Sequence, residues 1–256
     1  MLLTDTHTHL YSESFEEDRH DMVKRAIDAG VQTMLLPNID VSSIGPLTSL
    51  VNEWPENIFG MMGLHPCSVG ADVDKQLSII KTELYSGDYL AVGEMGVDLY
   101  WDQTYLEEQK HAFRTQVAWA KELDLPVVLH VRDAFEEVFA LMDELNDDRL
   151  RGVFHCFTGG ESEIKRICDF GGFYFGIGGV ITYKKSGLSE IAPLIPEKLL
   201  LLETDSPYLP PTPHRGKRNE SSYLTFIAQR LADSREVSIE HIAEVTTANA
   251  RELFRI

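Results

Sequence analysis

Short apolar runs alternate with amphipathic stretches along the whole of this 256-residue chain. Eight runs have the length of a strand, at residues 2–5, 32–36, 58–62, 89–92, 126–129, 152–154, 173–176 and 199–202. Several are continuously apolar, as is typical of strands buried on both faces, and residues 73–84 and 135–145 between them show helical spacing. This alternation predicts an α/β protein with a parallel sheet, either open and doubly wound or closed into a (β/α)8 barrel of the TIM type.

Composition narrows the class of protein. Hydrophobic residues make up 43% of the chain and charged residues 25%, which is ordinary for a globular protein. No apolar run reaches the roughly 18 residues of a membrane helix, and the first residues do not resemble a signal peptide. The three cysteines include no C-x-x-C pair, which indicates reduced thiols. We therefore expect a single domain over residues 1–256, cytoplasmic and without a membrane segment.

The net charge is −18, from 23 basic and 41 acidic residues. This argues against nonspecific nucleic-acid binding through the whole surface. A local positive site remains possible, because salt screens charges beyond about 8 Å. Arg215, Lys217 and Arg218 form the only dense basic cluster, which suits either a solvated loop or a contact with an anionic substrate.

Polar side chains stand at the C-terminal ends of five apolar runs. They are His7 and His9 after the first run, Glu94 after the fourth, His130 after the fifth, His155 after the sixth and Asp205 after the eighth. In an open sheet the first and eighth strands need not be neighbours. In a closed barrel they are adjacent, so all six side chains can converge at one mouth, where barrel enzymes keep their chemistry. These positions favour the barrel.

The residue types at these positions suit a metal site. His7 and His9 face the same side of an extended strand and supply half of such a site, although an H-x-H pair alone is a weak signal. Glu94 lies between Gly93 and Gly96, which indicates a crowded backbone. The alternative for Glu94, a capping or salt-bridged residue, is less favoured because a carboxylate that ends a buried strand needs a partner.

Other polar residues leave more than one interpretation. A single histidine such as His130 or His155 is commonly a hydrogen-bonded core residue, but two on adjacent strands favour ligands. Asp205 is a candidate for binding metal and for taking a proton from water. His65, in "GLHP", is either a functional group or a loop-structuring residue, and Asp98 could simply hold the following loop. Motifs of serine hydrolases, dinucleotide-binding proteins, P-loop proteins and H-E-x-x-H proteases are absent.

The motifs "DTHTHL", "GLHP", "VGEMGVD", "LPVVLHVR", "HCFTG", "ETDSPYL" and "RGKRNE" together resemble the TatD family of metal-dependent deoxyribonucleases, within the amidohydrolase barrel superfamily. The resemblance covers nearly the whole chain. Two departures are Tyr11, where many members carry an acidic residue, and Ser221, where proline is common. The resemblance implies a distorted (β/α)8 barrel with two divalent ions, one held by His7, His9 and Asp205 and the other by His130 and His155, with Glu94 as the bridge.

The activity implied by the resemblance is hydrolysis of DNA from a single-stranded 3′ end, with Mg²⁺, Mn²⁺ or Zn²⁺ as the metal and Asp205 and Glu94 as the catalytic carboxylates. Substrate contacts are expected from His65, Arg132 and Arg215. The alternative is a hydrolase with the same metal chemistry that acts on a small amide, ester or lactone, or on an aminoacyl-tRNA ester. A barrel that binds without catalysis is disfavoured, because all six metal-site residues are present.

Overall fold

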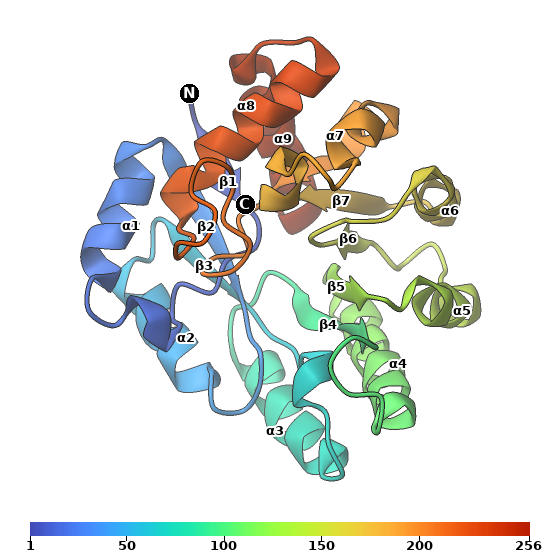
Figure 1. Cartoon of the computed structure of the whole chain (residues 1–256). Coiled ribbons are helices and arrows are strands. Elements are labelled where there is room, and N and C mark those ends of the chain that lie inside the picture. Colours follow the sequence, from blue (N-terminus) through green and yellow to red (C-terminus); the bar gives the residue numbers. More distant parts are fainter.

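Eight parallel strands alternate with helices in the computed structural model, which describes residues 1–256 (Figure 1). The strands are β1 Leu3–Asp5, β2 Val31–Pro37, β3 Ile58–Met61, β4 Val92–Asp98, β5 Val127–Arg132, β6 Gly152–Phe154, β7 Phe173–Ile177 and β8 Leu200–Leu202. The helices are α1 Arg19–Asp28, α2 Ile44–Glu53, α3 Val73–Ser86, α4 Leu106–Leu123, α5 Phe135–Leu145, α6 Glu161–Phe170, α7 Leu188–Ile191, α8 Leu224–Arg235 and α9 Ile239–Phe254. None of the helices combines the length and the apolar character that a membrane crossing requires.

The fourth strand differs most from its expected position. It begins at Val92, where the apolar run at 89–92 ends, and continues to Asp98, so Glu94 lies within the strand. Glycines permit this path beside β5. A Cβ at Gly93 would lie 2.6 Å from Val128 Cβ, and one at Gly96 would lie 1.9 Å from the carbonyl oxygen of His130. The crowding expected around Glu94 is therefore confirmed.

The strands close into a barrel through two seams. Parallel pairing runs in the order β1-β2-β3 and, separately, β4-β5-β6-β7-β8. At the first seam, Met62 after β3 pairs with Val92, the first residue of β4. At the second, Thr6 N donates to Leu202 O at 3.0 Å, which joins the first strand to the last. The closed barrel is thus confirmed over the open sheet.

The barrel interior has an apolar floor below a polar mouth. Val128 and Val153 belong to the inner cluster, and His130 and His155 follow two residues later on the same strands, so they face the same interior. The inner cluster consists of Leu35, Met61, Ala91, Val128, Val153, Tyr174, Leu201, Ala250, Leu253 and Phe254. Its last three members come from α9, which closes the floor. A separate cluster of 55 buried residues includes the packing between strands and outer helices.

A buried side-chain contact ties β1 to the segment after β8. Asp5 Oδ1 accepts a hydrogen bond from Thr204 N at 2.9 Å, and Asp5 Oδ2 accepts one from Thr204 Oγ1 at 2.6 Å. Burial raises the pKa of Asp5 to about 7, although the Thr204 hydrogen bonds lower it. Thr204 thus offsets part of the cost of holding a carboxylate inside the barrel.

We expect Thr204→Val to lower the free energy of unfolding by about 1.5–3 kcal/mol, because it removes a buried hydrogen bond to a carboxylate. The loss should be larger above pH 7 than below it, since Asp5 becomes anionic as pH rises through about 7 and then needs the hydroxyl donor most. Urea unfolding at both pH values measures this. Thr82→Val is the control, because the exposed Thr82 hydroxyl bonds only within its own helix. Equal losses in the two variants would contradict the role of Thr204.

Candidate metal centre

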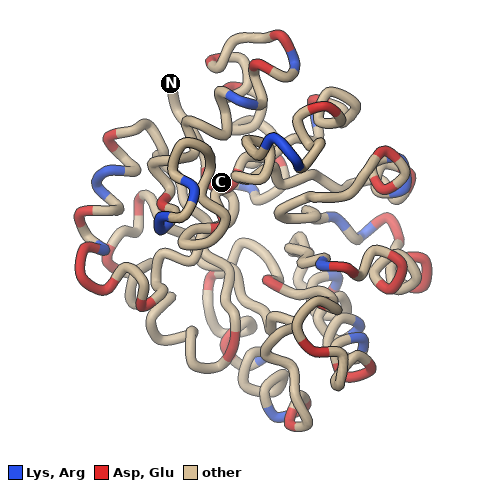
Figure 2. The backbone as a smooth tube through the Cα atoms, in the orientation of Figure 1, with Lys and Arg blue, Asp and Glu red and all other residues tan.

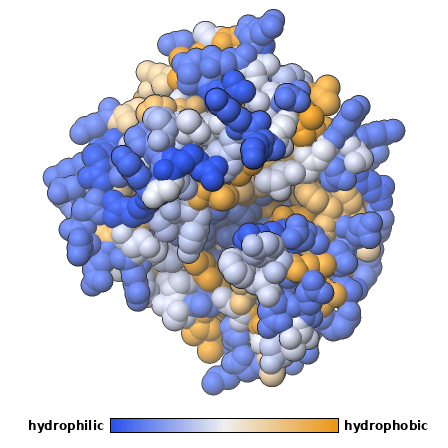
Figure 3. Space-filling model, viewed as in Figure 1, coloured by the Kyte–Doolittle hydropathy of each residue, from blue (hydrophilic) through white to orange (hydrophobic).

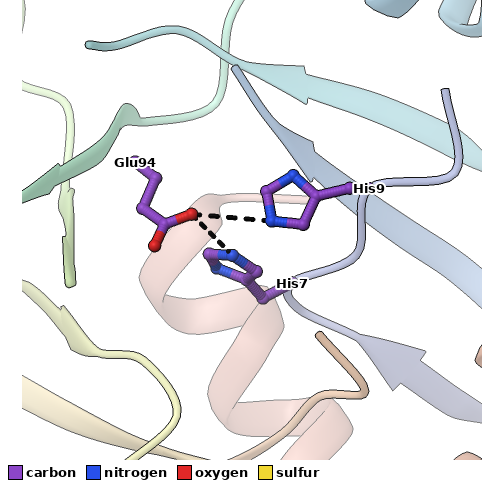
Figure 4. Close-up of side chains that lie close together, drawn as sticks. All are labelled: His7, His9 and Glu94. Carbon is purple, nitrogen blue, oxygen red and sulfur yellow. Dashed lines mark hydrogen bonds and ion pairs between the residues drawn. The ribbon is translucent and has the colours of Figure 1, made fainter. Parts of the chain in front are cut away.

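The carboxylate of Glu94 lies at the centre of the polar mouth, buried among histidines. Its Oε2 lies 3.1 Å from His7 Nε2 and 3.6 Å from His9 Nε2 (Figure 4). Its Oε1 lies 2.8 Å from both His130 Nδ1 and His155 Nε2. The two oxygens therefore face two different pairs of imidazoles.

Asp205 lies on the same side as His7 and His9. Its Oδ1 is 3.5 Å from His9 Nε2 and 3.8 Å from His7 Nε2. β8 ends at Leu202, and Asp205 has a φ of 55°, so strand alternation does not direct this side chain. Its position comes from a backbone hydrogen bond at the seam, in which Asp205 N donates to His7 O at 2.9 Å. The predicted convergence of all six side chains at one mouth is observed.

Contacts behind the imidazoles set which ring nitrogen faces the centre. The Tyr11 hydroxyl donates to Pro37 O at 2.6 Å, so at 3.0 Å it accepts the proton of His9 Nδ1 and leaves a lone pair on His9 Nε2. Asp98 Oδ2 lies 2.8 Å from His130 Nε2, which directs His130 Nδ1 to Glu94. Such contacts orient metal-binding histidines in proteins. Asp98 also accepts from the following loop, as expected, and the role of Tyr11 was not predicted.

Glu203 lies beside the stacked rings of His7 and His155, whose centroids are 3.8 Å apart. Its Oε1 is 3.4 Å from His155 Nδ1. Glu203 and Asp205 are two residues apart, a spacing that puts both side chains on one face of an extended strand. The turn at Asp205 separates them, and Glu203 is fully buried while Asp205 is partly exposed. Strand register would have revealed Glu203, because it lies two residues beyond Leu201 of the inner cluster.

His65 is the fifth histidine at the carboxylate of Glu94, with its Nε2 3.3 Å from Glu94 Oε1. It differs from His9 in which ring nitrogen carries the proton. Its Nδ1 accepts a hydrogen bond from Cys67 N at 3.0 Å, so the neutral ring carries its proton on Nε2. Burial and nearby histidines lower the pKa of His65, although Glu94 raises it. His65 therefore presents an N–H donor to the centre, and it also structures its own loop.

The buried carboxylates and imidazoles of this cluster shift one another's pKa values. Burial would raise the pKa of Glu94, but the surrounding histidines lower it well below its usual value, so Glu94 is anionic. Burial and the charge of His155 lower the pKa of His7. Burial also opposes protonation of His155, yet Glu94 and Glu203 raise its pKa well above the usual value. The two stacked rings therefore differ, since the pKa of His155 is raised and the pKa of His7 is lowered.

The donor set fits divalent cations. Ligand atoms of His7, His9 and Glu94 lie within 4.8 Å of one another, and so do those of His7, His155 and Glu203. Imidazole and carboxylate donors suit zinc and manganese, and carboxylates suit magnesium. In addition, His7 Nδ1, His155 Nδ1 and Glu203 Oε2 are buried without a hydrogen-bond partner. A lone pair of His9 also faces two carboxylates, an arrangement that a cation between them stabilises.

A hollow opens near the centre of the face seen in Figure 3, bordered by both hydrophilic and hydrophobic groups. Figure 2 shows Lys and Arg on the loop before α8, whereas many acidic residues lie on the outer helices. Arg215 of this loop is exposed and stacks 3.6 Å from the Tyr183 ring centroid. Arg132 is exposed at the end of β5. Arg218 differs from expectation, because it pairs with Asp18 at 2.7 Å. Fewer side chains of the basic cluster are therefore available to bind a substrate than predicted.

Comparisons with known proteins agree with this geometry. The family model of TatD related DNase matches residues 4–255. The chain is 38% identical to the uncharacterized metal-dependent hydrolase YabD of Bacillus subtilis, over the full length of both chains. It is 34% identical to the 3′-5′ ssDNA/RNA exonuclease TatD of Salmonella typhimurium, over 98% of each. The crystal structure of YJJV, a TatD homologue from Escherichia coli, has a TM-score of 0.91 and 28% identity, over 99% of this chain and 98% of that one.

We expect Gly96→Ala to disrupt the centre, because the new Cβ would lie 1.9 Å from His130 O and must push β4 away from β5. The free energy of unfolding should fall by about 1–3 kcal/mol, measured in urea. Gly45→Ala is the control, since nothing lies within 4 Å of its Cβ and alanine favours the helix by up to about 1 kcal/mol. If Gly96→Ala unfolds with the same free energy as the wild type, the close approach of β4 and β5 at Gly96 is not needed for stability.

Proposed function

Because this chain belongs to the family of TatD-related DNases, we propose that it removes nucleotides from the 3′ end of single-stranded DNA with two divalent ions. Membership confirms the resemblance in its motifs and makes the chain a metal-dependent hydrolase. The name of the Salmonella relative supports the substrate and the polarity. Residues 1–256 act as one domain in this proposal.

The observation that carries the proposal is the division of donors between the two oxygens of Glu94. On the Oε2 side, His7, His9 and Asp205 would hold one ion. On the Oε1 side, His130 and His155 would hold the second, and Glu94 would be a ligand to both. Mg²⁺, Mn²⁺ and Zn²⁺ all suit these donors. Two divalent ions exceed the charge of Glu94 and Asp205 together, so the mouth attracts a phosphodiester despite the net charge of −18.

Bound divalent ions lower the pKa of water towards about 7 and stabilise negative charge on a transferring phosphate. The residues of the chain supply the remaining functions. Asp205, at the open side of the cluster, orients the attacking water and accepts its proton. His65 donates a hydrogen bond from its Nε2–H group to a phosphate oxygen. Arg132 and Arg215, both exposed and cationic, bind flanking phosphates.

We expect wild-type protein to hold two ions per chain and Glu94→Ala to hold fewer, with activity lost in parallel, because Glu94 contacts both groups of histidines. Elemental analysis after gel filtration measures the ratio. Glu144→Ala removes an exposed carboxylate on an outer helix and serves as the control. At most one ion in well-loaded wild-type protein would contradict the bridge.

End-labelled single-stranded oligonucleotides test the reaction. Stepwise loss of nucleotides from the 3′ end is expected, and Asp205→Asn should reduce the rate by about 10²–10⁴-fold as a general base is removed. Arg215→Ala should weaken binding with a shallow dependence on salt, since few phosphates are contacted. Efficient cutting of a closed circular single strand would exclude end trimming. Turnover of small amides, esters or lactones without any cleavage of oligonucleotides would instead identify a small-molecule hydrolase.

A further inference from the structure

Two exposed aromatic side chains stand directly after β4, the strand that carries Glu94. Trp101 is 70% exposed and Tyr100 is 53% exposed. Single exposed apolar residues are common on protein surfaces and need no explanation. Adjacent exposed aromatics on the loop next to a reactive centre are different, because aromatic rings are the surfaces on which unpaired bases stack.

The loop is held in place by the same residues that build the centre. Asp98 Oδ1 accepts hydrogen bonds from Tyr100 N at 3.0 Å and Trp101 N at 3.2 Å. The other oxygen of Asp98 contacts His130 Nε2 at 2.8 Å, and His130 contacts Glu94. One carboxylate therefore sets the position of both a histidine of the centre and the two aromatic residues.

Arg132 lies next to these two aromatic residues. It belongs to β5, the strand that neighbours β4, and the loop after β4 leaves the barrel beside it (Figure 1). Its guanidinium carbon lies 3.8 Å from the Tyr100 ring centroid and 5.3 Å from that of Trp101. The rings of Tyr100 and Trp101 are nearly perpendicular, at 89°. Arg132 thus covers a face of Tyr100, while Trp101 remains the more open ring. Arg132 contacts the two rings and forms no ion pair with a carboxylate, so its donors are available to a phosphate.

We propose that Trp101, held by Asp98 and flanked by Arg132, is a stacking platform for a base of the single-stranded substrate. This inference rests on the proposed function and adds a specific contact to it. A base stacks on Trp101 while the adjacent phosphate meets Arg132. Because every base has a flat face, such a platform accepts any sequence and favours unpaired over paired nucleotides.

Tryptophan fluorescence of the metal-loaded protein gives a direct readout. Trp119 is buried and Trp54 is half-buried with its indole nitrogen enclosed, so Trp101 is the most exposed of the three tryptophans. Titration with a short phosphorothioate oligothymidylate, which resists cleavage, is expected to quench the emission. Trp101→Ala removes this reporter, so its Kd is measured from the fluorescence anisotropy of an end-labelled oligonucleotide and is expected to rise about tenfold, or about 1.4 kcal/mol.

Two further variants separate stacking from a structural effect. Trp101→Phe keeps an aromatic face and should recover most of the affinity. Tyr85→Ala removes an exposed aromatic residue from the outer helix α3 and should leave oligonucleotide trimming unchanged. Metal content, measured by elemental analysis, should stay equal in all variants.

The possible outcomes distinguish the two proposals. If the wild type trims oligonucleotides while Trp101→Ala binds them equally well, the platform is wrong and the exonuclease proposal stands. Loss of affinity in Trp101→Phe as large as in Trp101→Ala would also overturn the platform. If the wild type hydrolyses bis(p-nitrophenyl) phosphate but neither binds nor trims oligonucleotides, the exonuclease proposal fails and the platform fails with it.

Discussion

Closure of the last strand against the first is the constraint on which the centre depends. Backbone hydrogen bonds from Thr6 to Leu202 and from Asp205 to His7 join segments that lie at opposite ends of the chain. They place Asp205 beside both histidines of the first motif. Without this seam, the donors on the Oε2 side of Glu94 would have no common position. The buried Asp5–Thr204 contact supports the same seam from within the barrel.

The barrel interior contains an apolar floor and a polar, charged mouth, and the two are stabilised in different ways. The apolar floor is stabilised by burial of side chains from the strands and from α9. Above it, a carboxylate and several imidazoles are removed from water, which is costly unless they are paired. Hydrogen bonds that His9 donates to Tyr11 and His130 donates to Asp98 recover part of this cost and fix the direction of these two rings, and the Glu203 carboxylate lies 3.4 Å from His155 Nδ1. Divalent cations would recover more, so metal binding and stability of the mouth are expected to be linked.

Global and local charge act at different distances. Many of the acidic residues behind the net charge of −18 lie on the helices that surround the barrel (Figure 2). At the mouth, Arg132 and Arg215 are exposed next to aromatic rings, and the pairing of Arg218 with Asp18 removes one cation from this set. A long basic track is therefore missing, and contacts with a short strand end match the available groups better than binding along a duplex.

The sequence by itself determined the alternation of strands and helices, the barrel, and the identity of the six convergent side chains, because these follow from periodicity and from positions at strand ends. It did not reveal that His65 presents a proton donor, that Tyr11 sets the tautomer of His9, or that Glu203 underlies His155. It also did not reveal that Arg218 forms an ion pair, because the partner Asp18 lies 200 residues away in the chain. Only the tertiary structure decided these points, because local pattern sets which element forms, whereas strand register and loop path set which distant side chains meet.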